Sequence, residues 1–233
     1  MTPVDIDVPA SWPPHIYRAV SAWAAQCAGK TRYTNDLPLD LELESPFRRE
    51  LAGFFLRAYH YTKLLAHERD MIQRRGLRPL GVELLGERID AARTSGDITA
   101  AQAGSFHKGH VFAAGEHMHR EGQVCLVLSE RLFERKPDAC LPLLSNWGGE
   151  ALYMSSGSVL FRPQLGEIGT PTRVTALVAL DDASHAIYPA LHKVFVGSLL
   201  GLSDVGADVF YRAFVPPDRI ESIDEIESFD QDR

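Results

Sequence analysis

One histidine lies where two kinds of secondary structure are expected to meet. His60 stands inside the run Leu56–Thr62, where bulky and aromatic residues favour a half-buried β-strand. An imidazole can donate or accept a hydrogen bond near neutral pH, so it can hold a ligand hydroxyl or move a proton. Because the ends of elements often carry binding residues, His60 is a candidate site residue. The alternative is a partly buried histidine with one satisfied ring nitrogen.

Two carboxylates in the second half of the chain are candidates for acid chemistry. Glu150 follows Trp147 and two glycines, an arrangement that lets a ligand approach the backbone closely and offers an indole for ring stacking. Asp208 follows Gly206 and Ala207 at the start of an apolar run, from which it can point into a cleft. The alternatives are a glycine turn with a solvated glutamate for Glu150, and a carboxylate that protects a strand edge for Asp208.

Clusters of cationic and imidazole side chains give further candidates. Five arginines make the first strand–helix region basic and could bind phosphate in bidentate fashion; the alternative is a solvated helix face paired with nearby acids. They are Arg57, Arg69, Arg74, Arg75 and Arg78. Four histidines could bind zinc or nickel, but their spacing fits no standard zinc site, so a solvated loop over residues 107–121 is expected. They are His107, His110, His117 and His119.

The composition is that of an ordinary globular chain of 233 residues, with 45% apolar and 24% charged residues. A net charge of −7 argues against broad, charge-driven binding to duplex DNA or to acidic lipid. Three cysteines without metal-ligand spacing indicate a reducing, cytoplasmic setting. The N-terminus lacks the apolar stretch of a signal peptide, and no apolar run reaches the ~20 residues that a membrane helix needs.

Turn residues and apolar spacing predict the elements that hold these candidates. Helices are predicted over residues 14–27, 45–53, 62–75, 82–95, 99–106 and 141–146. Strands are predicted over residues 54–62, 123–128, 159–161, 173–180 and 207–214, and a strand or short helix over 220–223. Thr62 is expected to cap its helix, and Gly76 to end it in a left-handed conformation. Gly96 is expected to end the helix over residues 82–95, and either Asp97 or Thr99 to cap the next helix. Residues 185–206 are left unassigned because Gly197 and Gly201 interrupt their apolar residues.

The layout is therefore helical in the first half and mostly β in the second. It predicts a chain of the α+β class with an N-terminal helical extension over residues 1–53. A single α+β domain is expected over residues 54–223, followed by an acidic tail over residues 224–233.

The order of these motifs resembles that of the ADP-ribosyltransferases, in their bacterial toxin and effector branches. The resemblance is carried by R-x-Y-H-x-T at residues 57–62, I-x3-G-L at 72–77, a middle apolar strand, and V-P-P-x-x-I at 215–220. It covers roughly residues 54–223. It implies a mostly antiparallel, split β-sheet core of ADP-ribosyltransferase type behind the N-terminal helices.

The resemblance also implies roles for individual residues. In that family a histidine on the first core strand binds the ribose and nicotinamide side of NAD, and the threonine after it helps to hold that site. A carboxylate near the start of a late strand completes the site, and here Asp208 takes the place of the usual glutamate, with Glu150 as its rival. The catalytic candidates are His60, Glu150 and Asp208, and the NAD-binding candidates are Arg57, Tyr61, Thr62 and Trp147.

These considerations lead to one expected function and two alternatives. The expected function is an NAD-binding ADP-ribosyltransferase, or an NAD glycohydrolase, that acts on an intracellular macromolecule, uses NAD as its substrate and needs no metal. The first alternative is a non-catalytic binding module on the same fold, which the shorter carboxylate at Asp208 favours. The second is a metal-dependent hydrolase built on the histidines of residues 107–119.

Overall fold

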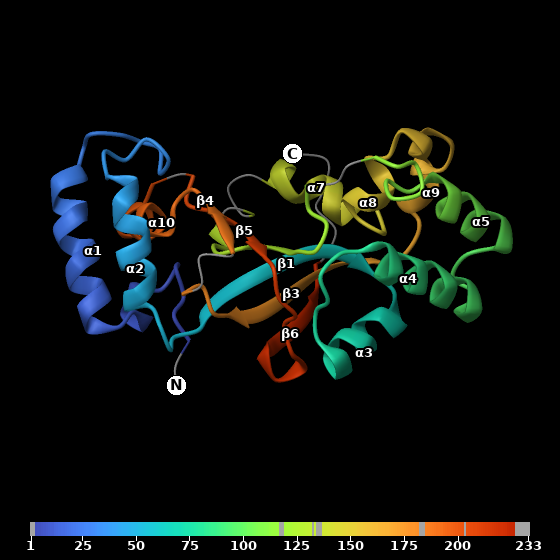
Figure 1. The fold of residues 1–233 in the computed structure, drawn as a ribbon, viewed down its shortest axis with the longest axis horizontal. Coiled ribbons are helices and arrows are strands. Elements are labelled where there is room, and N and C mark those ends of the chain that lie inside the picture. The colour runs from blue at the N-terminus through green and yellow to red at the C-terminus, as the bar shows by residue number, and fades with distance from the viewer. Residues whose placement is uncertain are drawn as a thin grey trace. The chain divides into compact units, whose positions relative to one another are not determined.

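A computed structural model of the chain describes residues 3–116, 119–131, 133, 137–181, 185–202 and 204–226. Within these residues, six strands form one sheet in the order β4-β5-β2-β1-β3-β6, and helices occur along the whole chain (Figure 1). The resolved registers are antiparallel, with Tyr59 on β1 opposite Val127 on β2 and Tyr188 on β4 opposite Asp208 on β5. The predicted α+β class with an antiparallel sheet is therefore confirmed.

The elements have the following bounds. The strands are β1 (Leu56–Leu64), β2 (Val124–Val127), β3 (Thr170–Val178), β4 (Ala186–Tyr188), β5 (Asp208–Tyr211) and β6 (Ile220–Glu225). The α-helices are α1 (Pro14–Cys27), α2 (Glu44–Glu50), α3 (Ala66–Arg75), α4 (Val82–Ser95), α5 (Ala100–Gly109), α7 (Pro137–Ser145), α8 (Glu150–Tyr153), α9 (Arg162–Leu165) and α10 (Leu191–Leu199). Short 3-10 helices are η1 (Pro9–Ser11), η2 (Leu41–Leu43), η3 (Ser156–Leu160) and η4 (Pro217–Arg219).

The chain divides into two compact units, each assembled from separate segments. The first unit contains Met1–Tyr59, Cys125–Pro137 and Thr175–Arg212, and the second contains His60–Val124, Asp138–Val174 and Ala213–Arg233. The boundaries expected after residues 53 and 223 remain predictions. Most of the expected acidic tail, residues 227–233, lies outside the described residues.

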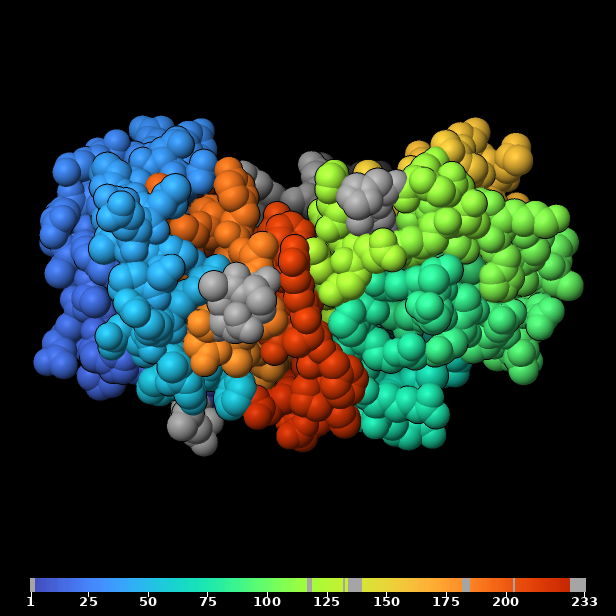
Figure 2. Space-filling model, in the orientation of Figure 1, coloured from blue at the N-terminus to red at the C-terminus, as the bar shows by residue number. Residues whose placement is uncertain are grey.

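In the first unit, α1 and α2 pack against α10, which comes from the opposite end of the chain (Figure 1). The blue and orange surfaces of these segments adjoin in Figure 2. The helix predicted over residues 14–27 is confirmed, and it buries Ile16 and Val20 while Tyr17 remains 44% exposed. Helix α10 was not predicted. Its Gly197 lies so close to Thr34 that an added Cβ would be 2.6 Å from the threonine hydroxyl, so the glycine serves close packing.

In the second unit, α4 and α5 pack together and follow the predicted signals. Gly96 ends α4 in a left-handed conformation, with φ 84° and ψ 8°. Thr99 caps α5 by accepting a hydrogen bond from the backbone N–H of Gln102, whose side chain bonds back to the Thr99 N–H. The predicted end at Gly96 is confirmed, and of the two predicted caps it is Thr99, not Asp97, that caps α5.

The boundary between β1 and α3 differs from the prediction. Strand β1 continues to Leu64, so Thr62 is a strand residue and does not cap a helix. Leu65 is the N-cap of α3 instead, and its backbone N–H donates to the Glu68 carboxylate at 2.8 Å. The side chain of the buried Glu68 therefore caps the helix. The sequence prediction considered only a hydroxyl group as the cap, so it did not identify Glu68. Gly76 has the predicted positive φ of 75° but an extended ψ of −173°, not the left-handed conformation.

Three other predicted elements and the predicted layout also need correction. Residues 159–161 were expected to form a strand but belong to η3 and its C-cap. The helix expected from Ser45 begins at Glu44, with Leu43 as its N-cap. Residues 107–109 continue α5, so the loop begins at His110 rather than at His107. The second half of the chain is not mostly β, because α7 to α10 lie there.

In the described part of the chain, no helix is long and apolar enough to cross a membrane.

Candidate functional site

Four of the predicted site residues lie on strand β1. His60 is half-buried, and Thr62 lies on the same face of the strand because alternate side chains share a face. Tyr61 is 4% exposed and Thr62 is 6% exposed, so both are largely enclosed by the protein. Arg57 forms an ion pair with Asp5, with 2.7 Å between Nη1 and Oδ2. Its guanidinium therefore already binds an acid of the chain.

Trp147 is a core residue and does not present a ring face for stacking on a ligand. Its side chain is fully buried, and its indole N–H donates to Glu68 Oε2 at 2.9 Å. The Arg88 guanidinium stands 5.4 Å from the centre of the indole ring, and the Phe106 ring packs on it at a centroid distance of 6.0 Å. This correction follows from burial, because a ring enclosed on these sides cannot also sandwich nicotinamide.

The same cluster contains a buried carboxylate, Glu68, that accepts hydrogen bonds from three donors. Glu68 accepts from Arg88 Nε at 2.6 Å, from the Leu65 N–H and from Trp147. Burial raises the pKa of Glu68, but the charge and hydrogen bond of Arg88, with the other two donors, outweigh burial and hold the pKa below its ordinary value. The carboxylate is therefore ionised and structural at neutral pH.

The two glycines before Glu150 serve the turn into α8. Gly148 has φ 81°, and a Cβ there would lie 2.1 Å from Leu152 Cδ1. Gly149 has φ 61° and is the N-cap of α8. Both conformations favour glycine, so the backbone geometry explains the glycines without a ligand.

Glu150 itself is held by its neighbours. Its Oε2 is 2.8 Å from Arg120 Nε, and its side chain is 15% exposed. Tyr153 hydrogen-bonds to the same carboxylate, and burial together with the Glu150 charge raises the pKa of Tyr153 to about 12. The phenol therefore stays protonated and donates to the carboxylate at all physiological pH values.

Asp208 has different surroundings. It is the first residue of β5, it is exposed, and it lies opposite Tyr188 of β4. Asp208 belongs to the first unit, whereas His60, Trp147 and Glu150 belong to the second.

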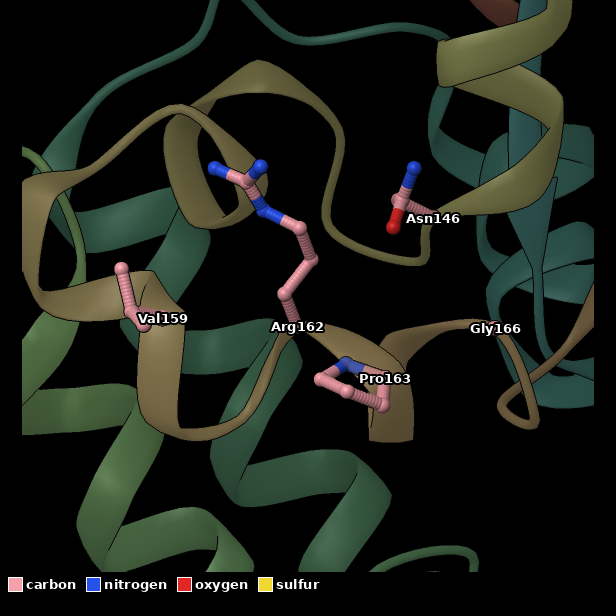
Figure 3. Close-up of a pocket in the computed structure, with 5 residues that line it drawn as sticks. All are labelled: Asn146, Val159, Arg162, Pro163 and Gly166. Atoms are coloured by element: carbon pink, nitrogen blue, oxygen red, sulfur yellow. The ribbon is translucent and has the colours of Figure 1, made fainter.

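The second unit also contains an open pocket of about 470 Å³ that the sequence did not indicate (Figure 3). It is lined by Asn146, Val159, Arg162, Pro163 and Gly166. The Arg162 side chain rises into the hollow, and Asn146 lies across from it (Figure 3). A lone arginine next to a proline gives no recognisable signal in the sequence, which is why this pocket was not predicted.

One wall of the pocket is connected to a buried lysine on β1. Lys63 is 6% exposed, and its ammonium group donates a hydrogen bond to the carbonyl oxygen of Gly166. Burial lowers the pKa of Lys63. A lysine inside the apolar end of a strand is a sequence signal that could have identified this position.

The predicted histidine loop is only partly described. His107 lies on α5 with Nε2 3.2 Å from Asp90, while His110 is buried and its Nδ1 accepts from the Ala113 N–H at 3.0 Å. Burial, with the charge of His107, lowers the pKa of His110. His117 lies outside the described residues. Among the residues that are described, no group of three or more His, Cys, Asp or Glu side chains is arranged to hold a metal ion.

Comparison of the chain with protein-family models, with curated proteins and with solved structures finds no significant match.

Proposed function

We propose that the chain binds NAD and cleaves its nicotinamide–ribose bond, transferring ADP-ribose to a macromolecule or to water in the cytoplasm. The observation that supports this proposal best is the strand order β4-β5-β2-β1-β3-β6. The strand with His60 is internal to the sheet, and the strand that begins with Asp208 belongs to the same sheet. An ADP-ribosyltransferase-type core requires a histidine on its first strand and an acid at the start of a late strand; His60 on β1 and Asp208 at the start of β5 are residues of these types at these strand positions.

The chemistry needs an orienting group and an anion. Breaking the glycosidic bond develops positive charge on the ribose, as in glycoside hydrolysis. A carboxylate beside the ribose stabilises that charge or activates the acceptor. A neutral imidazole can donate one N–H to a ribose hydroxyl, which fixes the sugar for the reaction. In this proposal His60 is the group that orients the ribose.

Of the two carboxylates, Asp208 is the better candidate for stabilising the positive charge that develops on the ribose. The Glu150 side chain is only 15% exposed and lies against Arg120 and Tyr153, so a substrate has little access to its charge. Asp208 is exposed at the beginning of β5, where a substrate can reach it. Thr62 supports the site beside His60, whereas the buried Trp147 has no part in it.

The test is nicotinamide release from NAD, measured by chromatography, with wild-type protein and with His60→Ala and Asp208→Asn. We expect wild-type protein to release nicotinamide and each variant to lose at least about 100-fold of the rate, because each removes a group that acts on the transition state. His107→Ala is the matched control, since its side chain is exposed on α5.

Thermal stabilisation by NAD separates the outcomes. Stabilisation of the wild type without nicotinamide release would favour the non-catalytic binding module. If wild-type protein shows neither stabilisation by NAD nor nicotinamide release, the proposed function is wrong.

A further inference from the structure

The pocket beside α9 contains an arginine that the protein fixes at one end only. Arg162 Nη2 donates to the backbone carbonyl of Tyr153 and to Ser158 Oγ, the latter at 3.1 Å. Within the described part of the chain, Nε and Nη1 of Arg162 have no hydrogen-bond partner, and Arg162 has no acidic partner. A guanidinium held in this way is preorganised and keeps donors for a ligand.

The second cation near the pocket also lacks an acid. The ammonium group of Lys63 donates a hydrogen bond to the carbonyl oxygen of Gly166, which lines the pocket. Lys63 forms no ion pair with any residue that the structure describes. A buried ammonium without a counter-charge is unfavourable, which is the reason that burial lowers its pKa. An anion bound nearby would relieve this cost. Two cations without acids are notable in a chain of net charge −7.

The remaining lining residues complete a small binding site. Asn146 Nδ2 donates to the Pro142 carbonyl at 2.9 Å, which orients the amide and leaves its Oδ1 to accept from a ligand hydroxyl. Val159 is 75% exposed, and Pro163, which also lines the pocket, is likewise apolar and exposed. The volume of about 470 Å³ falls within the range of small-molecule sites.

We propose that this pocket binds a small molecule through an oxyanion, a phosphate or a carboxylate, held by Arg162 Nε and Nη1, with an apolar portion against Val159 and Pro163. Planar guanidinium and oxyanion groups match in bidentate geometry, which makes such pairs strong and selective. Lys63 supplies long-range attraction from behind Gly166. The site uses neither His60 nor Asp208, so it is separate from the proposed NAD chemistry.

The experiment is a titration of the full chain with four probes at constant ionic strength, followed by thermal shift and by the NMR signal of the Arg162 Nε–H. The probes are phenyl phosphate, inorganic phosphate, benzoate and the neutral control benzyl alcohol. We expect saturable binding of phenyl phosphate or benzoate, weaker binding of inorganic phosphate, and no binding of benzyl alcohol. The NMR signal should shift with the same dependence on probe concentration as the thermal stability.

Arg162→Met should weaken binding of the charged probes at least tenfold. The matched control is Arg74→Met, because Arg74 is also exposed and donates only to a backbone carbonyl, that of Asp70. We expect Arg74→Met and His60→Ala to bind the probes as the wild type does, so failure of the NAD proposal would leave this one intact. Lys63→Met, if it folds, should weaken binding less than Arg162→Met.

The relative affinities for phenyl phosphate and benzoate identify which oxyanion the site prefers, and saturable binding of either supports the proposal. Three results would overturn it: no saturable binding of any charged probe to the wild type, equal binding to Arg162→Met, or binding of benzyl alcohol as tight as that of benzoate. If Arg162→Met does not fold, an Arg162 Nε–H signal that is unchanged by saturating phenyl phosphate would overturn it as well.

Discussion

Glu150 and Asp208 are two carboxylates that compete for one role, yet their surroundings differ. Glu150 begins a helix next to the core, is 15% exposed, and is bound by Arg120 and Tyr153. Asp208 begins an exposed end of a strand, opposite a tyrosine that is 60% exposed. The difference shows that a carboxylate after two glycines can be a structural anchor. Asp208, an exposed acid at a strand end, is the carboxylate that we propose for the chemistry.

The largest effect should come from the core residue that precedes Glu150. Trp147→Ala removes a fully buried indole and its hydrogen bond to Glu68, so we expect a loss of about 3–5 kcal/mol in the free energy of unfolding. Tyr188→Ala, beside Asp208, should cost less than about 1 kcal/mol because the ring is exposed. Urea denaturation measures both. Similar losses for the two variants would contradict the contrast between the regions.

The next effect concerns catalysis. Asp208→Asn should lower the rate of nicotinamide release by about 100- to 1,000-fold, whereas Glu150→Gln should lower it by less than about fivefold. Steady-state rates at saturating NAD measure both. The reverse order would transfer the catalytic role to Glu150 and break the comparison.

For the free energy of unfolding, we expect the reverse order: Glu150→Gln should have the larger effect and Asp208→Asn the smaller. Glu150→Gln removes a charge that Arg120 and Tyr153 use, so we expect a loss of about 1–2 kcal/mol. Asp208→Asn at its exposed position should change stability by less than about 0.5 kcal/mol. Denaturation of both variants under one set of conditions provides the measurement, and a costlier Asp208→Asn would be inconsistent with its exposure.

The smallest effect is a shift in one titration. The pKa of Tyr153 is about 12 in the folded chain, against an ordinary value of 10.0, so the folded state keeps a proton that the unfolded state loses. The resulting stability is fully present below pH 10 and is lost as pH rises through about 12. Glu150→Gln should lower the pKa of Tyr153 only part of the way to 10, because burial is the larger cause and remains. Tyrosinate absorbance, compared with Tyr153→Phe, would show this, and an unchanged pKa would argue against the contact with Glu150.

Much of the fold follows from local signals, and the exceptions have physical reasons. The helix that begins at Pro14 and the cap at Thr99 depend on nearby residues, so the sequence predicts them. Helix α10 depends on Gly197 packing against the distant Thr34, which local spacing does not reveal. The end of β1 depends on Glu68, a buried acid whose charge is compensated by Arg88.

The candidate site was less predictable than the fold. His60 was singled out as a candidate because its strand is strongly marked by aromatic neighbours, and its role stays a prediction. The prediction that Trp147 stacks on a ligand was wrong because Trp147 is fully buried. The sequence around a tryptophan next to glycines does not indicate whether its ring faces solvent or the core. Arg162 was missed because its significance lies in having no acidic partner in the described structure, and pairing of this kind is a tertiary property.

The measurement that tests the proposed function most directly is a crystal structure of the chain with a non-cleavable NAD analogue. The proposal predicts that the nicotinamide-side ribose lies within hydrogen-bond distance of the His60 imidazole and that the Asp208 carboxylate approaches the same sugar. An analogue bound elsewhere, for example with its phosphates on Arg162 and its ribose far from His60, would contradict it.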